Sequence, residues 1–208
     1  MLSITQGALR VSKGPVLWVA SGTGNYNPAV EGLIYRLWQG GYKVLRPCIW
    51  HKNPLPTGQG WFSNSWEYVV AVTNTWPLPY WNPEAVGQPI KYAYHGAIRH
   101  RKRDGTRVVR RNPMRTNYAV RKRPGNVFYV PVGGGHMGHP LACENEAPYP
   151  EALVEPFIKA LCPPGGTVLD PFCGSGTTLA VAGRLGRDAI GVDVRESQIE
   201  LSKRRLEL

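Results

Sequence analysis

The chain has few cysteines and no long apolar run, and both scarcities narrow the class of protein. Its 208 residues include 4 cysteines, Cys48, Cys143, Cys162 and Cys173, which stand far apart and form no Cys-x-x-Cys pair. This spacing argues against a zinc site and against a secreted domain built on disulfides, so we expect reduced thiols in a cytoplasmic protein. No run approaches the roughly 18 apolar residues of a membrane-spanning helix, and no signal sequence is visible, so neither membrane insertion nor secretion is expected.

The charge of the chain is concentrated in one segment. The net charge is +11, and residues 99–123 contain eleven Lys or Arg against a single acid, Asp104, so this segment alone carries +10. The hydrophobic content of 42% is enough for a core, which excludes a chain that is disordered throughout. The basicity is therefore a local patch on a folded protein.

The most informative stretch lies at residues 167–178, Thr-Val-Leu-Asp-Pro-Phe-Cys-Gly-Ser-Gly-Thr-Thr. Its apolar, β-branched start is bounded by proline and glycine, which predicts a buried strand of about four residues ending at Asp170. Gly174 and Gly176 then allow a tight turn with close approach to a ligand, and a helical pattern resumes at Thr177. A strand, a glycine loop and a helix N-terminus together predict a small-molecule cradle lined by amides.

A second strand is predicted at residues 188–192, directly before Asp193. Asp193 lies 23 residues after Asp170, near the spacing of about 20 at which a nucleotide-binding unit places a carboxylate on ribose hydroxyls. A glycine-rich turn with a capping aspartate would explain the same residues without a ligand. ATP and GTP are not favoured, because no Gly-Lys-Ser/Thr follows the glycines as it would in a P-loop.

The string Asp-Pro-Phe-x-Gly-Ser-Gly-Thr-Thr resembles motif I of the amino-group DNA methyltransferases, which methylate adenine N6 or cytosine N4. The resemblance implies an α/β fold with the Rossmann-like sheet of S-adenosylmethionine-dependent methyltransferases. It also implies that the glycine loop binds S-adenosylmethionine and that Asp193 binds its ribose. The cofactor-binding residues implied in this way are Asp170, Pro171, Phe172, Gly174, Ser175, Gly176, Thr177, Thr178, Asp193, Asn145 and Ala147.

Two other segments carry the resemblance. In the family, a His-Pro-Ala-x-Phe-Pro string contacts the methionine end of the cofactor; here Asn145 and Glu146 replace its His and Pro, so the match is weaker. The Trp-His-Lys-Asn string that begins at Trp50 and the aromatic-Glu-Tyr strand that begins at Trp66 are also similar to family strings. These two tryptophans could equally be core aromatics that flank strands.

The remaining patterns predict alternating helices and strands. One helix takes Asn27 as its N-cap and Pro28 as its first residue, buries Val30, Leu33, Ile34 and Leu37, and ends at Gly40. The basic residues near the end of the last predicted helix suit the helix dipole. Further helices are predicted at residues 1–12, 151–161 and 196–206, and further strands at residues 16–20, 43–50, 67–72 and 126–132.

Regular patterning fails between residues 76 and 124, where the family places its target-recognition region. Ten uncompensated charges would repel one another without an anionic partner, although any charged run could simply be a solvated face. We therefore expect a loop-rich segment that binds double-stranded DNA, with some arginines reaching guanine edges. The residues expected to contact DNA are Arg99, Arg101, Lys102, Arg103, Arg107, Arg110, Arg111, Arg115, Arg121, Lys122 and Arg123.

Three parts of the chain are expected. Residues 1–75 form the N-terminal part of the catalytic core, residues 76–125 form the basic DNA-contacting insertion, and residues 126–208 form the cofactor-binding part of the core. A metal site at His136 and His139 is not expected, because no Cys, Asp or Glu cluster completes the ligands nearby.

The catalytic tetrapeptide of the family, Asp/Ser/Asn-Pro-Pro-Tyr/Trp, is absent from the sequence. The motif order resembles the permuted beta class, in which this tetrapeptide precedes the other motifs and binds the amino group of an extruded base. Pro163 and Pro164 are better explained as a turn, and the prolines after Trp76 are separated by Leu78. We therefore expect no catalytic residue in this chain and a sheet that is incomplete at its N-terminus.

Three functions remain open. The first is part of a DNA methyltransferase that transfers a methyl group from S-adenosylmethionine to the exocyclic amino group of adenine or cytosine, with another polypeptide or upstream sequence supplying the missing strand. The second is a catalytically silent DNA-binding or partner subunit, and the third is an RNA methyltransferase. Cytosine-C5 chemistry is not favoured, because no cysteine directly follows a proline.

Overall fold

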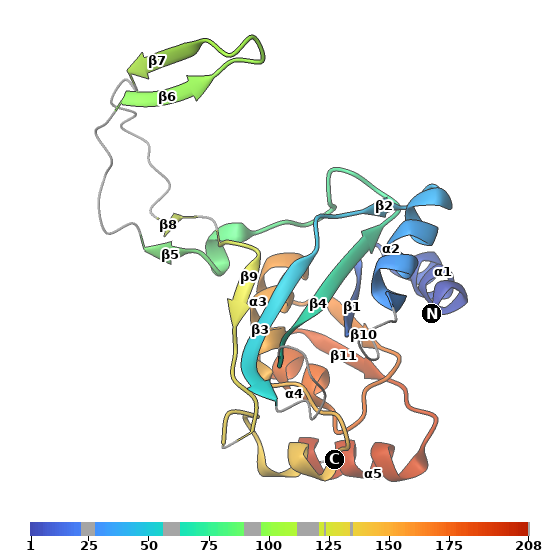
Figure 1. Cartoon of the computed structure of the whole chain (residues 1–208). Coiled ribbons are helices and arrows are strands. Elements are labelled where there is room, and N and C mark those ends of the chain that lie inside the picture. Colours follow the sequence, from blue (N-terminus) through green and yellow to red (C-terminus); the bar gives the residue numbers. More distant parts are fainter. Residues whose placement is uncertain are drawn as a thin grey trace.

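The computed structural model describes residues 1–21, 28–55, 63–89, 97–111, 121–122, 124–133 and 135–207. Helices and strands alternate in residues 1–44 and 151–206, whereas the described residues between them are mostly strands; this combination of helices with a mixed sheet confirms the α/β class (Figure 1). The helices are α1 (Leu2–Val11), α2 (Ala29–Gln39), η1 (Pro83–Ala85), η2 (Pro140–Glu144), α3 (Glu151–Leu161), α4 (Thr177–Arg184) and α5 (Glu196–Leu206). The strands are β1 (Val16–Ala20), β2 (Lys43–Val44), β3 (Cys48–Leu55), β4 (Asn64–Thr73), β5 (Gln88–Pro89), β6 (Ala97–Arg101), β7 (Arg107–Arg111), β8 (Arg121–Lys122), β9 (Val127–Tyr129), β10 (Thr167–Asp170) and β11 (Asp188–Gly191).

The larger sheet has the strand order β1-β4-β3-β9, with β2 paired to β4 as well. Strand β4 runs antiparallel to β1, β2 and β3, whereas β3 and β9 are parallel. The prediction of a single strand at residues 43–50 is wrong, because the structure has two strands there, β2 and β3. Pro47 stands at the break, and a proline has no N–H group to donate to a neighbouring strand.

Helices cover both faces of the larger sheet. Successive side chains of a strand point to opposite faces, so β1 contributes to two separate clusters. Val16, Trp18 and Ala20 pack with the cluster built on α1 and α2, whereas Leu17 and Val19 pack with the cluster that contains Leu153 of α3. Val30, Leu33 and Leu37 of α2 are buried as expected, but Pro28 is the N-cap of this helix and not its first residue, and Asn27 lies outside the described residues.

The second sheet consists of β10 and β11, which are parallel, with α4 connecting them. Thr167 is opposite Asp188 and Asp170 is opposite Gly191. This arrangement confirms the strand, helix, strand unit expected at the C-terminus. Because the strands are parallel, the residues that follow both of them lie at the same edge of the sheet.

Helix α3 lies across the boundary between the two sheets. Leu153 and Phe157 pack with residues of the larger sheet, whereas Val154 and Ile158 pack with residues of α4 and β10. Among the described residues, the hydrogen-bonded neighbour of β1 is β4 and that of β10 is β11. Each of these strands therefore has one edge that is unpaired within the described part of the chain.

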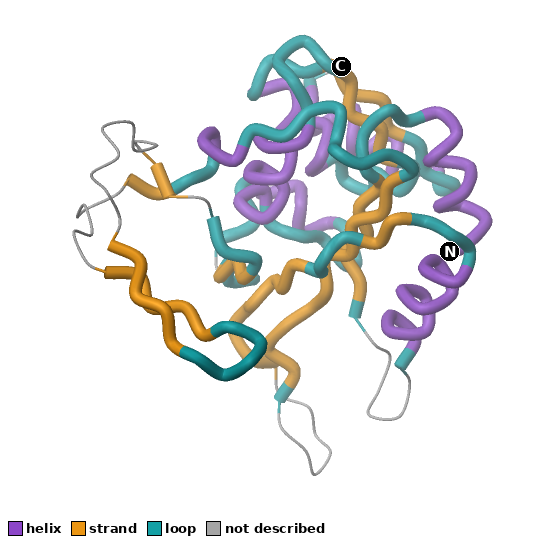
Figure 2. Tube along the Cα trace, turned by 90° about the horizontal axis from the view of Figure 1, so that it is seen from above, coloured by secondary structure: helices purple, strands orange, loops and turns teal. Residues whose placement is uncertain are grey.

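The basic segment contains a β-hairpin, which corrects the expectation of loops there. Strands β6 and β7 pair antiparallel from Ala97 opposite Arg111 to Arg101 opposite Arg107, and β5 pairs with β8. The turn runs from Lys102 to Gly105, where Gly105 N–H donates to the Lys102 carbonyl at 3.0 Å and Gly105 has a φ of +84°, so the Asp-Gly pair was a hairpin signal in the sequence. Both views show the β6–β7 hairpin lying apart from the helices (Figures 1 and 2).

Candidate functional site

The glycine loop after β10 is hydrogen-bonded to the residues that follow β11. Gly174 N–H donates to Asp193 Oδ2 at 3.1 Å, and Cys173 N–H donates to the Val192 carbonyl at 3.0 Å. In return, Val192 N–H donates to the Asp170 carbonyl at 2.9 Å. The two strand ends that the sequence singled out therefore meet at one edge of the sheet.

The two loop glycines are required by both conformation and space. Gly174 and Gly176 have φ values of +49° and +75°, in the left-handed region that favours glycine. A Cβ on Gly174 would come within 2.6 Å of Asn145 Nδ2, and one on Gly176 within 3.1 Å of Ser202 Oγ. Side chains at either position would displace the loop from its neighbours.

The loop offers two different environments. Its first part is accessible: Phe172 is 54% exposed, and Asp170 and Pro171 are partly buried. From Cys173 to Thr178 the residues are buried, and the Ser175 and Thr177 side chains face Arg205. A ligand would therefore contact the leading end of the loop and Asp193, while the buried part determines the shape of the loop.

Tyr149 forms a hydrogen bond with Asp170 that the sequence did not indicate. Its hydroxyl donates to Asp170 Oδ2 at 3.1 Å and lies 2.6 Å from Thr178 Oγ1, while Asp170 Oδ1 accepts from Phe172 N–H at 3.0 Å. Burial raises the pKa of Tyr149, and the negative charge of Asp170 raises it further. Its hydroxyl therefore remains a hydrogen-bond donor at neutral pH.

The segment expected to contact the methionine end of the cofactor also lies at this edge. Asn145 is placed against Gly174. The next residue, Glu146, forms an ion pair of 3.2 Å with the Arg195 guanidinium. The backbone N–H of Arg195 donates to Asp193 Oδ1 at 3.0 Å. Ala147 is exposed. The structure thus brings residues from three separate parts of the chain to the ends of β10 and β11.

The strings at Trp50 and Trp66 have different surroundings. Trp50 is buried and donates through Nε1 to the Val130 carbonyl at 2.7 Å, so it is a core residue. Lys52, also buried, forms an ion pair with Glu67 on the neighbouring strand. Trp66 is 43% exposed and packs edge-on against Tyr68. The core explanation therefore holds for Trp50 and not for Trp66.

The basic residues are described to different extents. Arg101, Lys102, Arg103 and Arg107 are exposed, and Arg101 lies opposite Arg107 in the hairpin. Hydrogen bonds from Thr106 lower the pKa of Asp104, so the turn keeps its one negative charge. Backbone positions alone are described for Arg99, Arg110, Arg111, Arg121 and Lys122, whereas Arg115 and Arg123 lie outside the described residues.

The structure also describes the two histidines and the proline pair that were considered in the sequence analysis. His139 Nδ1 accepts from Leu141 N–H at 3.2 Å at the start of η2, and His136 is exposed. Within the described ranges, no group of three or more His, Cys, Asp or Glu could hold a metal ion. Pro163 lies in a turn, where its carbonyl accepts from Gly166 N–H.

No helix in the described part of the chain is long and apolar enough to cross a membrane.

The fold matches solved DNA methyltransferase structures. The crystal structure of M1.HpyAVI aligns over 99% of this chain and 79% of that chain, with a TM-score of 0.57 and 21% identity. The cytosine-N4-specific PvuII DNA methyltransferase aligns over 93% of this chain and 64% of that chain, with a TM-score of 0.61 and 18% identity. The architecture is therefore the Rossmann-like α/β fold of S-adenosylmethionine-dependent methyltransferases.

Sequence comparison gives the family. A family model for DNA methylases of the N6/N4 type matches residues 7–204, so this protein belongs to that DNA methylase family. It is 36% identical over 88 residues to the type II methyltransferase M.ScaI of Streptomyces caespitosus, covering 41% of this chain and 29% of that protein. It is 39% identical over 103 residues to the DNA adenine methyltransferase YhdJ of Escherichia coli K12, covering 48% and 33%. The matched part of the chain spans about a third of the length of these curated relatives.

Proposed function

We propose that this chain forms the cofactor-binding and DNA-contacting parts of a methyltransferase that modifies the exocyclic amino group of adenine or cytosine in double-stranded DNA. The observation that supports this most strongly is the hydrogen bond between Gly174 of the glycine loop and Asp193, in a member of the DNA methylase family. The same family membership favours DNA over RNA as the substrate.

The residues at the edge of the β10–β11 sheet fit S-adenosylmethionine, which supplies the electrophilic methyl group when bound. Asp193 would accept hydrogen bonds from the ribose hydroxyls, because its carboxylate already lies beside the loop. Phe172 offers an exposed aromatic face for the adenosyl group, and Asn145 lies against the loop where the methionine end would extend. The buried members of the set, from Gly174 to Thr178, would act by shaping the loop.

The hairpin is proposed to bind the DNA backbone. Arg101 and Arg107 are exposed and directly opposite each other, an arrangement of like charges that costs stability in a sheet. Binding of phosphates would relieve this repulsion. We extend the same role to the other basic residues of the segment, and with it the division of the chain into core residues 1–75, insertion 76–125 and cofactor-binding residues 126–208.

We further propose that the strand carrying the catalytic acceptors comes from outside residues 1–208, either from another polypeptide or from upstream sequence, and that it binds between β1 and β10. Both strands have an unpaired edge in the described part of the chain, and both lie under α3. A helix is about 10 Å wide, which is about twice the spacing between neighbouring strands, so one strand fits between them. Leu169 and Ile190 lie opposite each other and are exposed, so one face of the β10–β11 sheet has apolar side chains that a larger assembly would cover.

Calorimetric titration with S-adenosylmethionine tests the cofactor site. Asp193→Ala is expected to weaken binding by about tenfold or more, since a charged hydrogen-bond acceptor is lost. Asp188→Ala is the matched control, because Asp188 is exposed at the opposite end of β11. If the wild-type chain binds no cofactor, or if both variants bind as the wild type does, the proposed site is wrong.

A further inference from the structure

Helix α5 contacts the glycine loop through two side chains on one face. Ser202 Oγ donates to the Gly174 carbonyl at 2.6 Å, and Arg205 Nη1 donates to the Ser175 carbonyl at 3.3 Å. These residues are three apart, so they project from the same side of the helix. Two consecutive carbonyls of the loop are therefore turned toward α5, and in planar trans peptides the following N–H groups, those of Ser175 and Gly176, point away from it.

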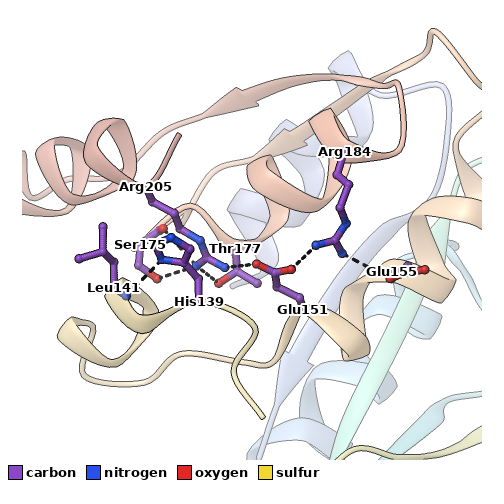
Figure 3. Close-up of polar contacts among 8 residues, drawn as sticks. All are labelled: His139, Leu141, Glu151, Glu155, Ser175, Thr177, Arg184 and Arg205. Carbon is purple, nitrogen blue, oxygen red and sulfur yellow. Dashed lines mark hydrogen bonds and ion pairs between the residues drawn. The ribbon is translucent and has the colours of Figure 1, made fainter. Parts of the chain in front are cut away.

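Arg205 is fixed in this position by further contacts (Figure 3). Its side chain is 1% exposed and its Nη1 also donates to Thr177 Oγ1 at 2.8 Å. Its Nη2 donates to Glu151 Oε1 at 2.6 Å. The planar guanidinium thus uses its two ends for different partners, the loop and the first residue of α3.

Glu151 completes the arrangement. Its second oxygen accepts from Arg184 Nη1 at 2.5 Å, and Arg184 also reaches Glu155 at 3.3 Å (Figure 3). Burial opposes ionisation of Glu151, but the hydrogen bonds from Arg184 and Arg205 outweigh it and lower its pKa. Glu151 is therefore a carboxylate at neutral pH, and it pairs with Arg205 in an environment where an unpaired charge would be costly.

Arg204, the next residue on α5, provides a contrast. Its side chain is 58% exposed and forms an ion pair of 3.2 Å with Glu144, which is itself 49% exposed. The two arginines share a helix turn and each pairs with a glutamate, yet one pair is solvated and the other is buried beside the loop. A solvated pair contributes little to stability or shape.

We propose that Arg205, held by Glu151, is a positioning residue that sets the conformation of the loop at residues 173–177 and thereby the affinity for the adenosyl cofactor. This inference rests on the proposed function. Arg205 contacts the buried side of the loop, so it acts through the backbone of Ser175 and the hydroxyl of Thr177. It removes the freedom of a glycine-rich turn that would otherwise lose conformational entropy when the cofactor binds.

The test compares Arg205→Met and Arg205→Lys with Arg204→Met. Arg205→Met is expected to weaken S-adenosylmethionine binding about tenfold, since hydrogen bonds from a charged donor are lost. Arg205→Lys keeps the charge but not the two-ended guanidinium, so it should show an intermediate loss of cofactor affinity. Arg204→Met should bind the cofactor as the wild type does. Backbone hydrogen exchange at residues 173–178 should be fastest in Arg205→Met, intermediate in Arg205→Lys, and as slow in Arg204→Met as in the wild type.

A double variant separates positioning from stability. Glu151→Gln with Arg205→Met removes both buried charges, so it should recover thermal stability relative to Arg205→Met alone without recovering cofactor affinity. Recovery of both would mean that the pair is only structural and would overturn the inference. So would equal affinity and equal loop exchange in Arg205→Met, Arg205→Lys and Arg204→Met. Failure of the wild-type chain to bind cofactor would instead overturn the proposed function together with this inference.

Discussion

Trp18 of β1 and Phe172 of the glycine loop lie with their ring centroids 5.8 Å apart, at an interplanar angle of 44°. Trp18 belongs to the larger sheet, whereas Phe172 lies in the loop that follows β10 of the second sheet, so this contact links the larger sheet to the proposed cofactor site. Trp18 is itself anchored, because its Nε1 donates to Thr5 Oγ1 of α1 at 3.0 Å. A change in the position of Phe172 should therefore alter the surroundings of a fixed indole ring.

Phe172→Ala is expected to weaken S-adenosylmethionine binding by up to about tenfold, because an aromatic contact is lost. Stability should change little, since Phe172 is 54% exposed. Calorimetry measures the affinity. Tryptophan fluorescence can follow the same titration, and the part of the signal that is lost in Trp18→Phe comes from Trp18. Val194→Ala, at a residue that is 98% exposed near the same edge, is the control. Equal affinities in the Phe172 and Val194 variants would remove Phe172 from the site.

Tyr149→Phe removes one hydroxyl and leaves Asp170 and Thr178 without that partner. We expect unfolding to become easier by about 1–2 kcal/mol, because both groups lose a partly buried hydrogen bond. Urea unfolding measures this loss. Tyr35→Phe is the control, because the Tyr35 hydroxyl bonds Gln39 on an exposed helix surface. The same loss in both variants would show that the contact with Asp170 has no special weight.

The lowered pKa of Glu151 predicts a pH dependence of stability. A carboxyl whose folded pKa lies below its unfolded value of about 4.3 contributes stability that is present above that value and is lost as pH falls through the folded pKa. Wild-type stability should therefore fall on acidification below about pH 4, and Glu151→Gln should show a shallower decline. Unfolding curves between neutral and acidic pH measure the difference. Parallel profiles would contradict the assigned ion pairs.

Replacing Arg101 and Arg107 together with Ala should weaken DNA binding and reduce the salt dependence by about two ions, at roughly 0.9 per phosphate contact. The variant should fold at least as well as the wild type, because two opposed like charges are removed. Titration of a duplex at several salt concentrations gives the slope. Arg36→Ala, on the exposed surface of α2, should not change it. An unaltered slope in the double variant would place the DNA surface elsewhere.

The proposed catalytic strand predicts that the isolated chain transfers no methyl group. Incubation with labelled S-adenosylmethionine and DNA should give no incorporation, while the cofactor still binds. In the same preparation, amides on the unpaired edges of β1 and β10 should exchange faster than those of β4, which has partners on both sides. Incorporation of label by this chain alone would refute the need for a separate strand.

Local signals explain which elements the sequence could predict. The helix at Glu151–Leu161 and the strand at Thr167–Asp170 have the expected bounds, because proline or glycine stands at or near both ends of each. The helix at Glu196–Leu206 also has the expected bounds, although no proline or glycine marks its ends. The hairpin at Ala97–Arg111 was missed because the density of charge obscured the turn at Asp104 and Gly105 and the valines beside it. Charge density carries no information about backbone conformation.

Contacts between distant residues explain what the sequence could not show. Arg205 was expected to interact with the helix dipole, but its partners, Glu151, Ser175 and Thr177, lie 28 to 54 residues earlier in the chain. Tyr149 stands where the family string has phenylalanine, and its hydroxyl finds Asp170 only in the folded protein. Neither contact leaves a periodic or motif-like signal. The residues of motif I could be identified, whereas the side chains that support them could not.

The placement of α3 has a mechanical consequence. Neighbouring residues of this helix, such as Leu153 and Val154, are inserted into different cores. Neither core can slide relative to the other without withdrawing a row of side chains from the same helix. The two halves should therefore melt in a single cooperative transition, and a force applied to the N-terminal half will be transmitted directly to the β10–β11 unit.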